Sequence, residues 1–194
     1  MPRIALFGTS ADPPHRGHAA ILTWLAQHFD YVAVWTAENP FKACQTPLIN
    51  RLDMLRLMLE ELQLPPDRVG LRQDLSHRWS IISVERAQAC WPGARLVLVV
   101  GSDLVNQLLT WHRAEDILAA VEVLVMPRPG YPITREGLAN LRCYTQVKVA
   151  NTAETIDAAS SSCRQIEDSD NLTPVVRDYI SQHQLYQPTF LAAE

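Results

Sequence analysis

Residues 4–18 read IALFGTSADPPHRGH, and this stretch decides the fold. Its first four residues form a short apolar run near the start of the chain, which predicts a buried strand. Gly8 then allows a tight exit from the strand and lets a ligand approach the backbone closely. Two consecutive prolines disfavour helix in the residue before each of them and so predict an extended loop. The stretch therefore predicts a strand followed by a ligand-binding loop.

A helix is expected to follow this loop, opening at Gly17 and His18 and continuing through the apolar residues of 19–26. The free N–H groups of its first turn and its dipole favour an anion. His15 and His18 can add imidazole N–H donors or positive charge to the same anion. Because open α/β sheets bind ligands at the C-terminal edge of their strands, this position favours a nucleotide phosphate.

Two histidines three residues apart can also be structural residues of a loop, or half of a zinc site. Zinc needs about four ligands, and no Cys or His pair of matching spacing occurs elsewhere in the sequence. The order of strand, glycine, prolines and helix favours phosphate binding over a structural pair and over a zinc site.

The 194 residues are expected to form a single domain, 1–194, in which 160–186 make a small C-terminal helical part. Hydrophobic residues make up 47% of the chain and charged residues 20%, as in ordinary globular proteins. The formal net charge of −4 argues against broad nucleic-acid binding, which needs a basic face. Any anionic ligand must therefore be held by a local cluster.

Four cysteines occur without CxxC spacing, so neither a zinc ribbon nor a disulfide framework is indicated. No signal-peptide pattern opens the chain, and no apolar run approaches the roughly 18 residues of a membrane helix. These features predict a cytoplasmic protein with free thiols and no membrane partner. A homo-oligomer is compatible with the sequence.

Apolar runs and helical patterns alternate along the chain. Strands are expected at 4–7, 31–35, 69–73, 96–100, 121–126 and 146–150, and helices at 48–62, 81–90 and 174–184. The helix 48–62 is indicated by leucines that recur every three or four residues, at Leu48, Leu52, Leu55, Leu59 and Leu62. Alternation of this kind predicts an α/β fold, a Rossmann-like doubly wound parallel sheet with flanking helices.

Two further loops follow strands and so fall at the same edge of the sheet. Lys42, in a loop with Pro40, can act as a point charge for a phosphate, or it can be a solvated surface lysine. Gly101 gives a tight turn before Asp103, whose carboxylate can accept from paired ribose hydroxyls or cap the next helix. The local sequence leaves both choices open.

The run SSSCR at 160–164 opens a helix with hydroxyl and N–H donors, which suit an anion. Arg164, one turn into that helix, adds a fork of donors for phosphate. On its own, the run is more typical of an ordinary helix cap.

Taken together, these segments resemble the HxGH nucleotidyltransferases, in which a strand is followed by GGxFDPxHxGH. The matching positions are Gly8, Asp12, Pro13, His15, Gly17 and His18. Thr9 stands where the second glycine is usual, and Ala11 stands where an aromatic residue is usual. The resemblance implies a fold of the nucleotidyltransferase type.

Other segments resemble the nicotinate-nucleotide adenylyltransferases within that superfamily. Residues 101–111 match their GSDxxxxLxxW pattern. SSSCR resembles their SSTxIR motif, with Ser161 in place of the threonine and Cys163 in place of the aliphatic residue, and residues 172–180 with 185–186 resemble their VPxxVxxYIxxxxLY ending. In that group the tryptophan stacks on the pyridine ring, which implies the same role for Trp111, and the serine-rich motif grips the ATP triphosphate. An indole face attracts a cationic ring; the alternative is that Trp111 belongs to the core.

Trp79 and Ser80 lie where that group has a SYTxDTL-like stretch, and the resemblance implies that they help to form the pyridine pocket. Ile82 replaces the Asp of that stretch. The preference for the acid over the amide mononucleotide is therefore open from sequence.

The resemblance implies ATP-dependent adenylyl transfer to nicotinate mononucleotide, giving nicotinate adenine dinucleotide and pyrophosphate, a step of NAD biosynthesis. The catalytic residues would be His15, His18 and Arg164. Nucleotide contacts would come from Gly8, Ser10, Gly17, Gly101, Asp103, Ser160 and Ser161, and acceptor contacts from Lys42, Trp79, Ser80 and Trp111. Mg²⁺ is expected to arrive with ATP, because no carboxylate cluster for a metal is evident.

Three alternatives stay open. A nucleotidyltransferase that prefers nicotinamide mononucleotide shares the phosphate-binding residues, as do enzymes that use phosphopantetheine or CTP, although Trp111 and the tail argue against the last two. The departures at Thr9 and Ala11 leave room for a non-catalytic nucleotide-binding module. A structural α/β scaffold, with the histidines as loop residues, is the third alternative.

Overall fold

The computed structural model describes residues 1–38, 45–151, 160–164 and 170–186. Six parallel strands form one sheet in the order β3-β2-β1-β4-β5-β6. Their bounds are β1 Arg3–Thr9, β2 Tyr31–Thr36, β3 Val69–Leu71, β4 Arg95–Gly101, β5 Glu122–Met126 and β6 Val147–Val149. The strand order reverses between β1 and β4, and ligands of doubly wound sheets bind beyond the strand ends at such a point. The predicted α/β doubly wound sheet is confirmed.

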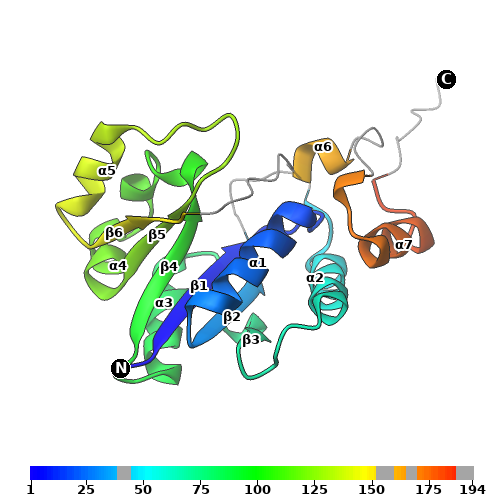
Figure 1. The fold of residues 1–194 in the computed structure, drawn as a ribbon, viewed down its shortest axis with the longest axis horizontal. Coiled ribbons are helices and arrows are strands. Elements are labelled where there is room, and N and C mark those ends of the chain that lie inside the picture. Colours follow the sequence, from blue (N-terminus) through cyan, green and yellow to red (C-terminus); the bar gives the residue numbers. More distant parts are fainter. Residues whose placement is uncertain (39–44, 152–159, 165–169, 187–194) are drawn as a thin grey trace.

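Helices cover both faces of the sheet (Figure 1). The bounds are α1 Arg16–His28, α2 Leu48–Leu62, α3 Ser80–Cys90, α4 Ala114–Ala120, α5 Arg135–Arg142, α6 Ser160–Arg164 and α7 Pro174–Gln182. Alternate residues of β1 pack against the helices on the two faces of the sheet, because successive side chains of a strand point to opposite faces. Ile4 and Leu6 pack in the cluster that holds α3 and α4, while Ala5 and Phe7 pack in the cluster that holds α1.

Several predicted boundaries need correction. The predicted strand 69–73 ends at Leu71, because Gln73–Leu75 form a 3-10 turn. In that turn Gln73 binds the end of β2, accepting from the N–H and the hydroxyl of Thr36. The helices α4 and α5 were not expected, although both lie among the described residues. They cover the layer on the α3 side, where Ile117, Leu118 and Leu141 are buried.

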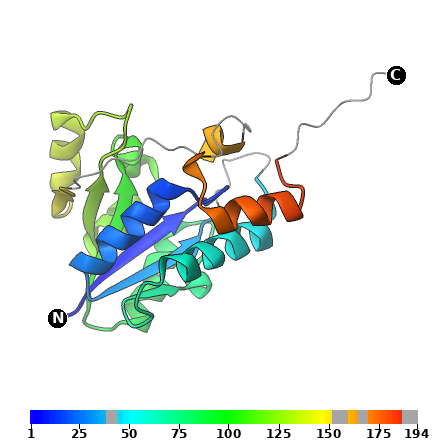
Figure 2. The same ribbon diagram turned by 45° about the vertical axis from the view of Figure 1, so that its right-hand side comes forward.

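The predicted helix 48–62 is confirmed as α2, but its leucine repeat does not by itself mark the buried face. The buried residues are Arg51, Met54, Leu55 and Met58, whereas Leu48, Leu52, Leu59 and Leu62 are only partly buried. The cause is a third cluster, in which Met54 and Met58 pack with Cys163 of α6 and Val176 of α7. Figures 1 and 2 show α7 lying alongside α2. The helix therefore packs on two sides, against the sheet and against the C-terminal helices.

No helix among the described residues is long and apolar enough to span a membrane.

Candidate active site

A cavity of about 1730 Å³ lies at the C-terminal ends of β1 and β4, where the strand order reverses. It is lined by twelve of the residues expected from sequence: Gly8, Ser10, His15, Gly17, His18, Trp79, Ser80, Gly101, Asp103, Trp111, Ser160 and Arg164. Lys42 lies outside the described residues, and Ser161 belongs to α6 but its side chain is not described. The structure thus brings together segments from the beginning, the middle and the C-terminal part of the chain.

Close packing explains the glycine at the end of β1. A Cβ atom on Gly8 would lie 2.8 Å from the indole ring of Trp35 on the neighbouring strand. The chain then turns at Ala11, a fully buried residue with φ of +45°, a left-handed conformation that costs energy for an alanine. Such a conformation persists only where surrounding contacts hold it.

Buried Arg51 of α2 makes hydrogen bonds that hold the β1–α1 loop, residues 10–15. Only 3% of Arg51 is exposed. Its Nη1 donates to the carbonyl oxygens of Ser10 (2.8 Å) and Ala37 (2.9 Å), and its Nε donates to Thr46 (2.9 Å). Burial lowers the pKa of this guanidinium, but its ordinary value of 12.5 leaves it a cation near neutral pH. One side chain therefore ties the loop to the segments after β2.

The Asp12 carboxylate is a second anchor of the loop. Tyr186 donates its hydroxyl to Asp12 Oδ1 at 2.7 Å, and the N–H of Thr46 donates to Oδ2 at 3.4 Å. Burial raises the pKa of the Tyr186 phenol, so the phenol stays protonated and keeps donating. The C-terminal segment thus reaches back to the β1–α1 loop.

Helix α6 contacts the same loop through the two described polar side chains that were expected there. The Ser160 hydroxyl donates to the carbonyl of Pro13 at 3.0 Å, and Arg164 Nη1 donates to the carbonyl of Asp12 at 2.7 Å. Both residues line the cavity. Because a guanidinium carries five N–H donors, Arg164 can hold the loop and bind an anion at the same time.

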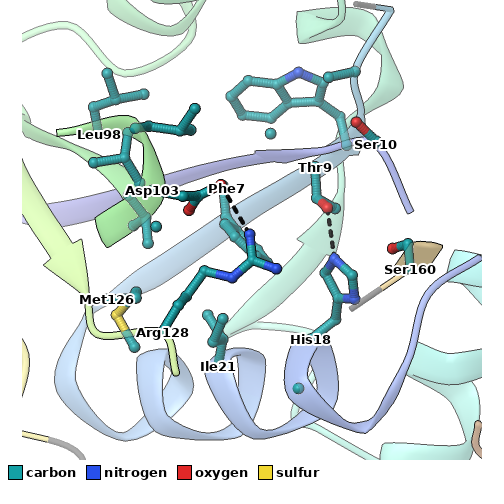
Figure 3. Close-up of a pocket in the computed structure, with 18 of the residues that line it drawn as sticks. Phe7, Thr9, Ser10, His18, Ile21, Leu98, Asp103, Met126, Arg128 and Ser160 are labelled. Atoms are coloured by element: carbon teal, nitrogen blue, oxygen red, sulfur yellow. Dashed lines mark hydrogen bonds and ion pairs between the residues drawn. The ribbon is translucent and has the colours of Figure 1, made fainter. Parts of the chain in front are cut away.

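The two histidines pack together, with ring centroids 3.9 Å apart. Burial, with a smaller contribution from the positive charge of Arg128, lowers the pKa of His15 from 6.5 to about 4. His15 is therefore a neutral donor at neutral pH, which corrects the alternative that it brings positive charge. Its buried Nδ1 has no hydrogen-bond partner among the described residues. His18 contacts Thr9 through Nε2 (Figure 3).

Asp103 forms an ion pair that the sequence did not suggest. Arg128 Nη1, just beyond β5, lies 3.0 Å from Asp103 Oδ2, and Figure 3 shows the pair beside the histidine. Asp103 caps no helix through its side chain, so that alternative is wrong. A Cβ on Gly101 would lie 2.8 Å from Arg128 Cδ, which explains the glycine. Asp103 Oδ1 is buried without a partner in the described part of the chain and can accept from a ligand hydroxyl.

The other end of the cavity is aromatic. The Trp79 ring lies 4.7 Å from the His112 ring, measured between centroids, and the Arg78 guanidinium lies 5.1 Å from the Trp79 ring centre. Trp111 is partly buried, so it both packs on the core and lines the cavity. Ser80 begins α3. Flat ring faces beside a cation suit a planar ligand that carries negative charge.

Arg51, Arg128 and Tyr186 have no role in the expectations from sequence. Arg128 carried a usable signal, because it follows a strand as closely as Asp103 does. Arg51 lies four residues before Leu55 and therefore on the buried side of α2. The 174-residue separation between Tyr186 and Asp12 has no local signal.

No group of three or more His, Cys, Asp or Glu side chains that could hold a metal ion occurs within residues 1–38, 45–151, 160–164 and 170–186.

The fold and the cavity define a nucleotide-binding α/β protein. Hydrogen-bond donors of the β1–α1 loop and the aromatic side chains of Trp79 and Trp111 line the same cavity. Comparison with known proteins goes further. Residues 6–166 match the cytidylyltransferase-like family. A protein of Synechocystis sp. named "Probable nicotinate-nucleotide adenylyltransferase" is 44% identical over 95% of this chain and 99% of its own length. A Gemmatimonas aurantiaca protein of the same name is 32% identical over 95% and 92%.

The chain belongs to the cytidylyltransferase-like family and, within it, to the nicotinate-nucleotide adenylyltransferases. A solved structure, the Plasmodium falciparum nicotinic acid mononucleotide adenylyltransferase complexed with NaAD, superposes with a TM-score of 0.83. The two chains share 17% identity, and the superposition covers 96% of this chain and 98% of the other. At that identity the likeness supports the fold alone.

Proposed function

We propose that this protein transfers the adenylyl group of ATP to nicotinate mononucleotide, giving nicotinate adenine dinucleotide and pyrophosphate. The observation that carries the proposal is that one cavity joins the β1–α1 loop to the aromatic end. We call the first part the phosphate end (the loop with His18, Ser160 and Arg164) and the second the ring end (Trp79, Ser80, Trp111 and His112). A mononucleotide has a phosphate group for the phosphate end and a planar ring for the ring end.

The reaction needs positioning rather than a general base. The 5′-phosphate of the acceptor attacks the ATP α-phosphorus, an O–P bond forms, and the bond to the pyrophosphate leaving group breaks. A phosphate monoester has a second pKa of about 6, so the nucleophile is already largely dianionic near neutral pH. Catalysis then consists of aligning two phosphates and stabilising the charge that develops. Neutral His15 suits this task as a hydrogen-bond donor that transfers no proton.

The roles of the individual residues follow the positions of the described residues and, for Lys42 and Ser161, the resemblance to the nicotinate-nucleotide adenylyltransferases. His15 and His18 steady the α-phosphate and the leaving pyrophosphate, and the backbone at Gly8, Ser10 and Gly17 lets the phosphates approach. Arg164, Ser160 and Ser161 hold the β- and γ-phosphates. Mg²⁺ enters as part of the MgATP substrate. Asp103 Oδ1 accepts from a ribose hydroxyl, and Lys42 binds the acceptor phosphate.

The ring end favours the acid over the amide. Residues 77–84 and 110–112 carry Arg78, His77 and His112 but no acidic residue. Complementary charge gives specificity, and the carboxylate of nicotinate mononucleotide supplies it, whereas the amide does not. Trp111 and Trp79 offer ring faces to the pyridinium. We place this activity in the cytoplasm, in one domain whose 160–186 part completes the phosphate end.

The ratio of the two products tests the proposed function. Purified protein with ATP, Mg²⁺ and nicotinate mononucleotide should release one pyrophosphate for each nicotinate adenine dinucleotide, measured by a coupled pyrophosphate assay and by chromatography. Omitting any one component should abolish both products. Nucleotide binding without pyrophosphate release would overturn the proposal in favour of a non-catalytic module.

A further inference from the structure

Thr9, the last residue of β1, stands where the GGxFDPxHxGH motif has its second glycine, and its hydroxyl makes two contacts in the cavity wall. Thr9 Oγ1 lies 2.8 Å from His18 Nε2 and accepts from the N–H of Ala11 at 3.3 Å. Figure 3 shows Thr9 pointing toward the His18 ring, with their contact drawn as a dashed line. A glycine could make neither side-chain contact.

The hydrogen bonds define the tautomer of His18. The backbone N–H of His15 donates to His18 Nδ1 at 3.2 Å, so Nδ1 acts as an acceptor and carries no proton. In the neutral ring the proton is then on Nε2, and the contact with Thr9 runs from Nε2–H to Oγ1. Both ring nitrogens are therefore engaged, and the ring is fixed in orientation as well as in tautomer.

A count of donors and acceptors gives the remaining step. A hydroxyl has two acceptor lone pairs and one hydrogen. Thr9 Oγ1 accepts from His18 and from Ala11, which uses both lone pairs. Its own hydrogen is left to donate, and the residue lines the same cavity as His15, Gly17 and Ser160. Accepting a bond from the imidazole also polarises the hydroxyl and makes it a better donor.

We propose that Thr9 is a phosphate-binding residue of this protein: it holds His18 in the Nε2–H tautomer and donates its own hydroxyl hydrogen to the nucleotide phosphate. The inference rests on the proposed function for the identity of the ligand. This role gives the chain a side-chain donor at a position where the related motif has a glycine.

Binding measurements test the donor. Thr9→Val keeps the shape and removes the hydroxyl, whereas Thr9→Ser restores it. The affinity for a non-hydrolysable α,β-methylene ATP analogue with Mg²⁺, measured by calorimetry, should fall about 10- to 100-fold in Thr9→Val, since hydrogen bonds to charged groups are the stronger ones. Thr9→Ser should stay within about threefold of the parent. Thr145→Val is the matched control, because that hydroxyl donates to the Val121 carbonyl and lies outside the cavity.

Histidine ¹⁵N NMR of the ligand-free protein tests the positioning. The parent and Thr9→Ser should show His18 protonated on Nε2, and Thr9→Val should show a mixture of tautomers. A purely structural Thr9 would lower the melting temperature of Thr9→Val while leaving the tautomer and the affinity of the folded protein unchanged, and that result would overturn the proposal.

The two proposals fail separately. If the parent protein binds the analogue with the expected Thr9 dependence but does not use nicotinate mononucleotide, the proposed function is wrong and the assignment of Thr9 stands. If the parent uses nicotinate mononucleotide and Thr9→Val binds and turns over equally well, the assignment of Thr9 is wrong and the function stands.

Discussion

The phosphate end and the ring end of the cavity are built differently. The β1–α1 loop is held by side-chain hydrogen bonds from distant segments: buried Arg51 of α2, exposed Arg164 of α6 and partly buried Tyr186 of the C-terminal segment. The ring end is made of partly or fully exposed aromatic side chains, in which the Trp79 ring lies 4.7 Å from the His112 ring and the Trp79 N–H donates to His77 Nδ1 at 3.0 Å. Fixed donors are needed where charge develops. Stacked rings are enough where a planar group is recognised.

The largest effect is expected from the phosphate end. His18→Ala removes a ring held at both nitrogens beside the reacting phosphates, so kcat should fall about 100- to 1,000-fold, as when one transition-state donor is lost. Steady-state kinetics with saturating ATP measures it. His183→Ala is the control, because His183 is exposed and stacks on Tyr179 outside the cavity. Retained turnover in folded His18→Ala would remove this residue from the catalytic set.

Arg51→Met tests whether buried anchoring defines the phosphate end. Three backbone carbonyls lose their donor, so the free energy of unfolding should fall by about 2–4 kcal/mol and the affinity for ATP should fall with it. Urea unfolding and calorimetry measure the two. Arg56→Met on the solvent side of the same helix should change stability by less than about 1 kcal/mol. Equal effects of the two substitutions would contradict the anchoring role.

Acid should destabilise the protein through His15. The unfolded chain binds a proton below about pH 6.5, whereas folded His15 stays neutral down to about pH 4. The unfolded state therefore binds more protons in that window, and stability falls as the pH falls from 6.5 to 4. The free energy of unfolding should fall by up to about 3 kcal/mol because of His15. The difference in unfolding free energy between the parent and His15→Gln, measured across pH 4–7, isolates it, because the other groups are common to both proteins. A difference that does not vary with pH would refute a depressed pKa.

A smaller and more selective effect is expected from the ring end. Trp111→Ala should raise KM for nicotinate mononucleotide about 10- to 100-fold and leave KM for ATP within about twofold, because one stacking face is lost and no phosphate contact. Trp111→Phe should recover most of the loss. Trp91→Ala removes an indole outside the cavity and should leave both KM values unchanged. If KM for ATP rose in parallel with KM for the acceptor, the two ends would not be separate.

The fold could be predicted because its signals are local. Apolar runs and loop residues indicated each strand, and glycine, proline and histidine spacing placed the β1–α1 loop at the correct edge of the sheet. The C-terminal end of β3 and the buried face of α2 could not be predicted in the same way. Both depend on contacts with distant residues, of Gln73 with Thr36 and of Met54 with Val176.

The candidate site shows the same difference between features with local sequence signals and features that depend on distant contacts. Twelve expected residues line one cavity, because motif residues at strand ends converge in any doubly wound sheet. The pairing of Asp103 with Arg128 and the neutral state of His15 could not be predicted, since burial and partners across the fold set both. The contact of the Thr9 hydroxyl with His18 also has no signal in the sequence, where Thr9 is a departure from the glycine motif.

The most direct test of this two-part site is the ratio of kcat/KM for nicotinate mononucleotide to that for nicotinamide mononucleotide, measured in parallel by pyrophosphate release with ATP and Mg²⁺. The phosphate end treats both acceptors alike, so the ratio reports the ring end by itself. We expect a preference for the acid of at least about a hundredfold. Equal use of the two, or a preference for the amide, would contradict the assignment of acid recognition to the ring end.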